Sequence, residues 1–238
     1  MPAGLAAGLV GLIVLEPDLG SALLFGPTFL AMTVVAGVRM RFVWIALIAA
    51  ALLAPVAYLG VLKPYQRARI DAITAQIKGD DRYESSIGFQ GWRAMRLVGA
   101  GGVLGNDKER ARALVEYNKL PEEHNDMIFA VIACRFGLLG ASAVLACHGL
   151  FALGAVLLAM VARDGFTRLV AVGIGALLFA QMTVNIGMTI GLLPITGVTL
   201  PFTSYGGSSL LSCWILTGLL FGIGIRPPMG GEKDPFDA

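Results

Sequence analysis

Acidic and imidazole side chains gather in the segment LPEEHNDMIF, residues 120–129, just before a long apolar run. Ionisable groups are costly to hold where a polar segment enters a membrane, so this cluster indicates a chemical role. Glu122 and Glu123 suit the positive N-terminal end of a helix that begins here. Asp126 lies one turn further into that helix, where stabilisation by the helix N-terminus is fading. A purely structural role therefore explains Asp126 less well than the two glutamates. Asp126 is therefore the first catalytic candidate, with Glu122 as a like charge that would tune its pKa.

Arginines lie in two segments that precede this cluster. Arg67 and Arg69 directly follow an apolar run, and Arg93 and Arg96 would share a helix face at i,i+3 spacing. Guanidinium groups bind phosphate oxygens in a forked geometry, although headgroup anchoring is the commoner role of arginines at a membrane exit. The glycine-rich segment 88–105 lacks clean periodicity, so we expect an interfacial or re-entrant piece there rather than a span.

The composition indicates a polytopic membrane protein. Hydrophobic residues make up 56% of the chain and charged residues 14%, whereas a soluble domain is about 25% charged. The net charge of +2 is too small to indicate nucleic acid as a partner. Several apolar runs are long enough, or nearly so, to cross a core of roughly 30 Å. They cover approximately 19–37, 42–62, 127–161, 169–193 and 205–225. A further run, 3–15, is too short to span alone, and we interpret it as the end of a truncated helix.

The short connections indicate an orientation. Alternating the spans places on one side the arginines Arg39, Arg41, Arg163, Arg168 and Arg226. The positive-inside rule makes that side cytoplasmic. We therefore expect membrane helices over 1–62, a large extracytoplasmic loop over 63–126, three membrane helices over 127–226, and a cytoplasmic tail over 227–238.

Structural roles suffice to explain the remaining polar and thiol residues. Asp18 precedes an apolar run and suits a helix N-cap. The cysteines lie in apolar runs without CxxC spacing, which indicates buried thiols; they are Cys134, Cys147 and Cys213. The two histidines are too few and too far apart for a zinc site, so no metal ligands are predicted. The loop 193–209 is expected to be architectural, with Thr203 or Ser204 capping the last helix.

Four stretches together resemble one family. They are EPDLGSALL, YQRARI, LPEEHNDMIFAVI and NIGMTIGLLPITGVTLPFTSYGGSSLL. In order and spacing they are similar to the SEDS family (shape, elongation, division and sporulation) of RodA-, FtsW- and SpoVE-like proteins. The resemblance implies an all-α polytopic membrane bundle in which this chain supplies about six apolar segments of a ten-helix fold, from its C-terminal part.

The same resemblance implies a peptidoglycan glycosyltransferase of the bacterial cytoplasmic membrane that polymerises lipid II at the outer face. The expected partner is a class B penicillin-binding protein. The essential aspartate of the family's PE-x-HTDFIF motif falls on Asp126. A carboxylate there can act as general base on the acceptor hydroxyl during inverting transfer. The leaving pyrophosphate needs arginines, a divalent cation such as Mg or Mn, or both. The expected substrate-binding residues are Asp18, Arg67, Arg69, Gln90, Arg93, Arg96, Glu122 and His124, of which Arg69 matches the motif most directly.

Several positions depart from the family pattern. Asn125 replaces a threonine, Arg93 replaces a glutamine, and Cys134 with Arg135 replaces two glutamates that many relatives carry. Two other functions therefore stay open. One is transport of the same lipid-linked precursor, which would favour polar residues near the bilayer midplane. The other is a catalytically silent scaffold that binds a penicillin-binding protein.

Overall fold

The computed structural model describes residues 19–60, 62–83, 86, 88–120, 124–162 and 164–225. Over these residues the chain forms helices and connecting turns without a strand, which confirms the predicted all-α membrane fold. The expected cap at Asp18, the glutamate Glu122, the short apolar run 3–15 and the tail 227–238 lie outside the described residues.

Five long helices correspond to the five predicted spans. They are α2 (Leu19–Val35), α3 (Met40–Gly60), α7 (Ile128–Val161), α8 (Gly165–Thr189) and α9 (Gly207–Ile225). Among the described residues, α3, α7, α8 and α9 are long and apolar enough to cross a membrane, and the apolar part of α2 is shorter. Helix α8 begins earlier than predicted because the Asp164 carboxylate accepts a hydrogen bond from the Thr167 amide at 3.0 Å, an N-cap interaction.

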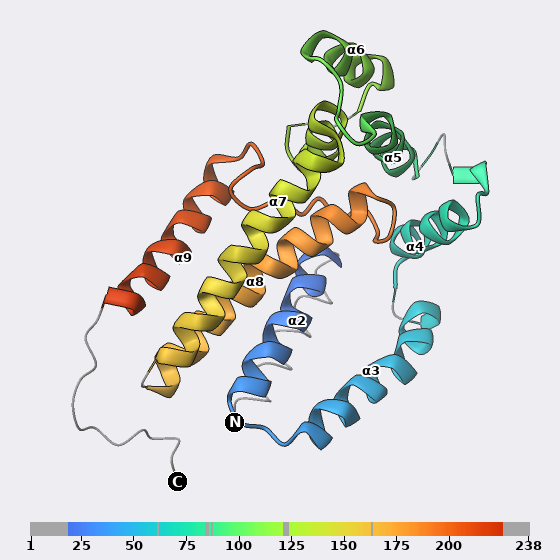
Figure 1. Ribbon diagram of the computed structural model, residues 1–238. Coiled ribbons are helices and arrows are strands. Elements are labelled where there is room, and N and C mark those ends of the chain that lie inside the picture. The colour runs from blue at the N-terminus through green and yellow to red at the C-terminus, as the bar shows by residue number, and fades with distance from the viewer. Residues whose placement is uncertain are drawn as a thin grey trace.

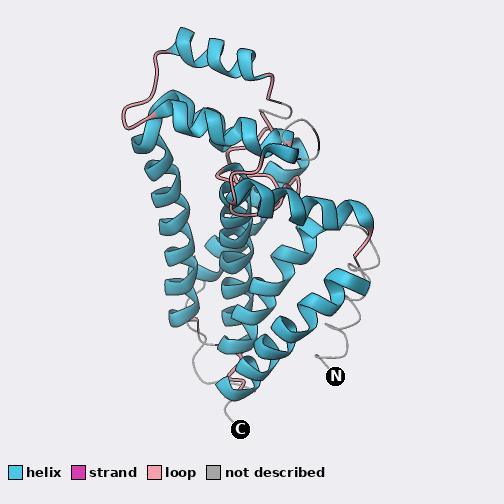
Figure 2. Cartoon of the chain, turned by 90° about the vertical axis from the view of Figure 1, so that its right-hand side faces the viewer, coloured by secondary structure: helices cyan, strands magenta, loops and turns pink. Residues whose placement is uncertain are grey.

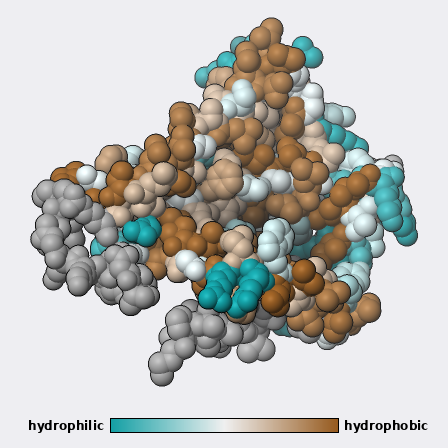
Figure 3. Space-filling view, turned by 60° about the horizontal axis from the view of Figure 1, so that its bottom comes forward, coloured by the Kyte–Doolittle hydropathy of each residue, from teal (hydrophilic) through white to brown (hydrophobic). Residues whose placement is uncertain are grey.

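Helices α2, α7 and α8 lie side by side, and α9 packs against α7 and α8 (Figure 1). Small side chains let these helices approach closely, as where Gly175 of α8 faces Ala155 of α7. Helix α3 stands apart on one side, and most of its apolar side chains are exposed. Apolar residues also cover most of the face seen in Figure 3. Lipid can cover such surfaces, which a water-soluble monomer rarely exposes.

The three cysteines are free thiols. Cys134 and Cys213 are buried as predicted. Cys147 is exposed, so the expectation of a buried thiol is wrong there. It lies on α7 beside His148, and both residues line a hollow together with Phe202 of the segment between α8 and α9.

Short helices lie within the segment 63–126, which was predicted to be a large loop. They are α4 (Pro64–Ile77), the single 3₁₀ turn η1 (Asp81–Tyr83), α5 (Phe89–Gly101) and α6 (Lys108–Asn118). They gather at the end of the bundle where α7 begins and α8 ends. The connection 36–39, the end of α7 and the start of α8 lie at the opposite end (Figures 1 and 2). Helix α5 has 13 residues, too few to span a core that needs about 20, and it packs on α7.

Helix α7 is broken at Gly137, where the sequence predicted one continuous run. Gly137 has φ 64° and ψ −159°, a conformation available essentially to glycine alone. The amides of Leu138 and Leu139 donate instead to the carbonyls of Gly102 and Val103, at 2.9 and 3.3 Å. The chain that leaves α5 is thus inserted into the break, because it supplies the acceptors that the helix lacks.

We expect Gly137→Ala to destabilise the protein by about 1–3 kcal/mol or more, because alanine is strained in this conformation and its Cβ would meet the backbone of Val103 and Gly105. Thermal unfolding in detergent micelles measures the change. The control is Gly149→Ala in the same helix, where an added Cβ meets nothing within 4 Å. Equal unfolding temperatures for the two variants would contradict this account of the break.

Candidate functional site

Asp126 lies in a turn of residues 124–127 that directly precedes α7. The helix begins at Ile128, so Asp126 stands before the helix and not one turn inside it as expected. Asp126 is 7% exposed, a burial that is unusual for a carboxylate. The position of this side chain therefore depends on whatever holds the turn.

The turn is held by hydrogen bonds that three successive main-chain carbonyls of the turn accept. The His124 oxygen accepts from the Tyr205 amide at 2.8 Å, and the Asn125 oxygen accepts from Ser204 Oγ at 2.6 Å. The Asp126 oxygen accepts from Asn185 Nδ2 at 2.7 Å. The donors come from the end of α8 and from the loop 190–206 that joins α8 to α9. We call Asn185, Ser204 and Tyr205 the carbonyl clamp.

The two side chains of the carbonyl clamp are themselves fixed by the loop. Ser204 Oγ accepts from the Leu200 amide at 2.7 Å while it donates to Asn125. Asn185 Nδ2 donates a second bond to the Val198 carbonyl at 2.8 Å. Each side chain therefore ties the turn to the loop 190–206.

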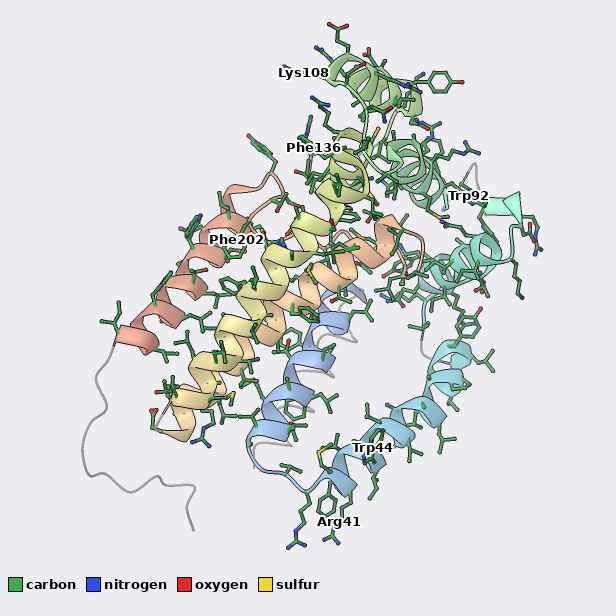
Figure 4. All side chains as sticks on the ribbon, viewed as in Figure 1. Arg41, Trp44, Trp92, Lys108, Phe136 and Phe202 are labelled. Atoms are coloured by element: carbon green, nitrogen blue, oxygen red, sulfur yellow. The ribbon has the colours of Figure 1, made fainter. Side chains whose placement is uncertain are left out.

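Phe202 anchors this loop to the helices. Its ring centroid lies 5.4 Å from that of Phe151 on α7 and 5.9 Å from that of Trp214 on α9, and Figure 4 shows it between these helices. Phe202 has φ 59°, which is rare for a residue other than glycine. His148 Nε2 lies 3.0 Å from the Pro201 carbonyl. The packing of Phe202 thus holds the loop in a shape that its backbone would otherwise disfavour.

A second group of polar side chains lines a cavity of about 180 Å³ between α4, α5 and the end of α8. Arg69 and Gln90, both predicted for the site, lie here together with Gln76. Sequence reasoning missed Gln76, although its seven-residue spacing from Arg69 places both on one helix face. Met188 of α8 also lines the cavity, one turn after Asn185, so the end of α8 joins the cavity to the carbonyl clamp.

Other predicted arginines make bonds at helix ends. Arg67 Nη2 and Nε donate to the carbonyls of Leu59 and Leu62 at 2.7 and 3.0 Å, at the end of α3. Arg93 donates to carbonyls at the end of α6 and lies over the Phe89 ring, 3.6 Å from its centroid. A cation is favourable at such negative helix ends. Neither arginine lines the cavity of Arg69, so their role as substrate ligands stays a prediction.

Arg96 and His124 are the remaining predicted substrate-binding residues within the described part of the chain. Arg96 is exposed on α5, and the His124 side chain is exposed while its carbonyl is held by the clamp.

Cys134 and Arg135 lie where the segment after α5 contacts α7. Arg135 donates to the Asn106 carbonyl, and Asn106 Nδ2 donates to the Cys134 carbonyl at 2.9 Å. These bonds hold the chain after α5 against the broken part of α7. The two positions predicted to depart from the family pattern therefore lie at the contact between the segment after α5 and α7.

The divalent cation expected from the resemblance needs a set of acidic or imidazole ligands. Within the described part of the chain, no three His, Cys, Asp or Glu side chains converge on one point. Glu122 and Glu123 lie outside that part. The described residues do not fit such an ion, so no step of the chemistry is assigned to one here.

Outside the membrane-spanning helices, the pKa of Asp80 is shifted by a neighbouring charge. The Arg82 guanidinium lies 2.6 Å from this carboxylate and holds the pKa of Asp80 below its usual value. The pair lies at the surface beside η1, where an ion pair contributes little to the free energy of unfolding.

Comparison with known proteins identifies the family. The family model described as cell cycle protein, of FtsW, RodA and SpoVE, matches residues 1–226. The probable peptidoglycan glycosyltransferase FtsW of Synechocystis is 37% identical over 91% of the chain and 53% of its own length. The peptidoglycan glycosyltransferase MrdB of Helicobacter pylori is 36% identical over 92% of the chain and 57% of its own length.

Solved structures of similar fold point to the same family. A chain from a structure of a peptidoglycan synthase complex that coordinates polymerization and crosslinking has a TM-score of 0.75 at 33% identity, over 92% of this chain and 59% of that one. A mutant of the rod shape determining protein RodA from Thermus thermophilus has a TM-score of 0.60 at 27% identity, over 96% of this chain and 57% of that one.

The chain spans about half the length of the relatives it matches. With these motifs, this fold and these matches, the chain belongs to the FtsW/RodA/SpoVE family of cell cycle proteins.

Proposed function

We propose that this chain carries the transfer site of a peptidoglycan glycosyltransferase that polymerises lipid II, with Asp126 as the general base. The observation that carries the proposal is a buried carboxylate in a turn fixed by three long-range bonds. A buried ionisable group at a helical membrane end is costly and indicates function. The names of the relatives, which are peptidoglycan glycosyltransferases, support the same reaction class.

The reaction needs a base at the acceptor hydroxyl and a cation at the leaving pyrophosphate. The acceptor 4-hydroxyl attacks the anomeric carbon of the α-linked donor, and the new β-1,4 bond forms as the bond to pyrophosphate breaks. The Asp126 carboxylate takes the hydroxyl proton, and the polyprenyl pyrophosphate leaves with the electron pair. General base catalysis of this kind contributes about 10²–10⁴-fold to a rate.

The cavity of Arg69 suits the leaving group. Its volume of about 180 Å³ is small compared with the roughly 300–1,000 Å³ of typical drug-sized ligand sites, so it would take the pyrophosphate and not the whole headgroup. The Arg69 guanidinium can donate two parallel bonds to phosphate oxygens, and Gln76 and Gln90 add amide donors. Arg69 would therefore stabilise the charge that develops as the pyrophosphate departs.

The placement of these residues supports glycosyl transfer over transport. The Asp126 turn and the Arg69 cavity lie at the end of the bundle capped by α4–α6 (Figure 1), whereas a transporter places its binding residues near the midplane. The arginine pattern of the short connections would set this end outside the cytoplasm. We further propose a class B penicillin-binding protein as partner, because polymerization and crosslinking are coordinated in the related synthase complex.

We expect Asp126→Asn to lower the rate of lipid II polymerisation by about 10²–10⁴-fold, because the amide cannot accept the proton. Labelled glycan strands made by the purified chain in nanodiscs measure the rate. The chain is tested alone and co-expressed with the part of the Synechocystis FtsW relative that it does not match. Glu116→Gln, an equal charge change on exposed α6, is the control and should leave the rate unchanged. Folded wild type without product in both formats, or equal rates for wild type and Asp126→Asn, would refute the proposal.

We expect Arg69→Gln to weaken the use of lipid II by about 10- to 100-fold in kcat/KM, the range for a lost hydrogen bond to a charged group. Steady-state polymerisation at varied lipid II concentration gives the value. Arg112→Gln removes the same charge from the exposed face of α6 and serves as the control. If both variants lose activity equally, the effect comes from net charge near the membrane and not from the cavity.

A further inference from the structure

The carbonyl clamp acts on the two peptide groups that flank the Asp126 Cα. The carbonyl of Asn125 belongs to the peptide plane before that atom, and the carbonyl of Asp126 belongs to the plane after it. Each plane is rigid, so the backbone at one residue has only two soft torsions, φ and ψ. Ser204 holds the first plane at 2.6 Å and Asn185 holds the second at 2.7 Å. Together the two bonds restrict both torsions of Asp126 and hence the direction of its Cα–Cβ bond.

We propose that Asn185 and Ser204 are positioning residues that set where the Asp126 carboxylate points. The proposal rests on the function proposed above for Asp126. Neither residue needs to touch substrate, because each acts through the main chain of the turn. The loop 190–206, predicted as architecture, is on this account part of the machinery that orients the catalytic carboxylate.

The burial of Asn185 supports a specific role for its amide. The side chain is fully buried in α8, and its Oδ1 has no hydrogen-bond partner. An unpaired buried acceptor costs free energy, which a leucine of similar shape would avoid. What leucine lacks is the NH₂ group, whose two protons are both used, on the carbonyls of Asp126 and Val198. Rotating the amide would set Oδ1 against two acceptors, so its orientation follows from its surroundings.

The direction of the Ser204 bond is fixed in the same way. A main-chain amide can only donate, so the hydroxyl accepts from the Leu200 amide and must use its proton on the Asn125 carbonyl. The partners are 79 residues apart in sequence for Ser204 and 59 for Asn185. The clamp is therefore a tertiary contact, and its loss would release the turn without unwinding a local helix.

The first test uses hydrogen exchange, which needs no activity. In the full chain in nanodiscs, Ser204→Ala and Asn185→Asp should raise exchange of the Tyr205 amide and of the 124–127 segment by about tenfold, because amides exchange through local opening. Ser204→Thr keeps the hydroxyl and should restore protection. The control is Thr199→Val, which removes a 2.9 Å bond between the same loop and Ser209 of α9 but leaves the turn untouched.

The second test uses polymerisation kinetics. Displacing a catalytic group by about 1 Å can cost roughly 100-fold, so Ser204→Ala should lower kcat by about 10- to 100-fold and change KM by less than about twofold. A changed KM with unchanged kcat, or exchange that rises equally in Thr199→Val, would overturn the proposal. If wild type makes no polymer, the proposed function fails. The exchange result still decides whether Asn185 and Ser204 hold the turn.

Discussion

The peptide groups around Asp126 need hydrogen-bond donors that their own segment does not provide. The turn 124–127 precedes α7, and three of its carbonyls, those of His124, Asn125 and Asp126, bond to donors outside that helix. An unsatisfied carbonyl in an apolar setting is costly. The donors come from Asn185, Ser204 and Tyr205, which are distant in sequence. The site therefore forms only when α8, α9 and the loop 190–206 have packed on α7. Phe202, held between the rings of Phe151 and Trp214, links that loop to the membrane helices.

The same physical rule explains the break in α7. Amides that lose their helical acceptors at Gly137 find carbonyls at Gly102 and Val103, and Asn106 supplies the neighbouring bonds. The break draws α5 onto α7, and α5 in turn forms one wall of the cavity that holds Arg69. Irregular backbone at both places is stable because another part of the chain satisfies it, as membrane proteins require. Departures from regular helix thus coincide with the two parts of the proposed site.

The sequence was informative where a feature is local or periodic. Apolar runs located the five long helices, because a span must be long and apolar, and the motif around Asp126 pointed to the carboxylate. The family resemblance named Arg69 and Gln90 as substrate-binding residues, and both line the same cavity. Long-range partners left no such signal. Ser204 resembled a helix cap, yet its hydroxyl binds Asn125. Asn185 opens one of the four matched stretches, but no feature of the sequence predicted its bond to the Asp126 carbonyl. The bond of Arg93 to the end of α6 also depends on a tertiary contact that composition does not encode.

The central claim is that the clamp acts through the carboxylate of Asp126, and a double-mutant cycle tests it most directly. Lipid II polymerisation is measured for wild type, Ser204→Ala, Asp126→Glu and the double variant. Glutamate keeps the acid but displaces it by one methylene, so its orientation by the clamp is already lost. If Ser204 acts through Asp126, Ser204→Ala lowers the rate in wild type but changes it by less than about twofold in Asp126→Glu, because coupled residues are not additive. The same fall in both backgrounds would contradict the account.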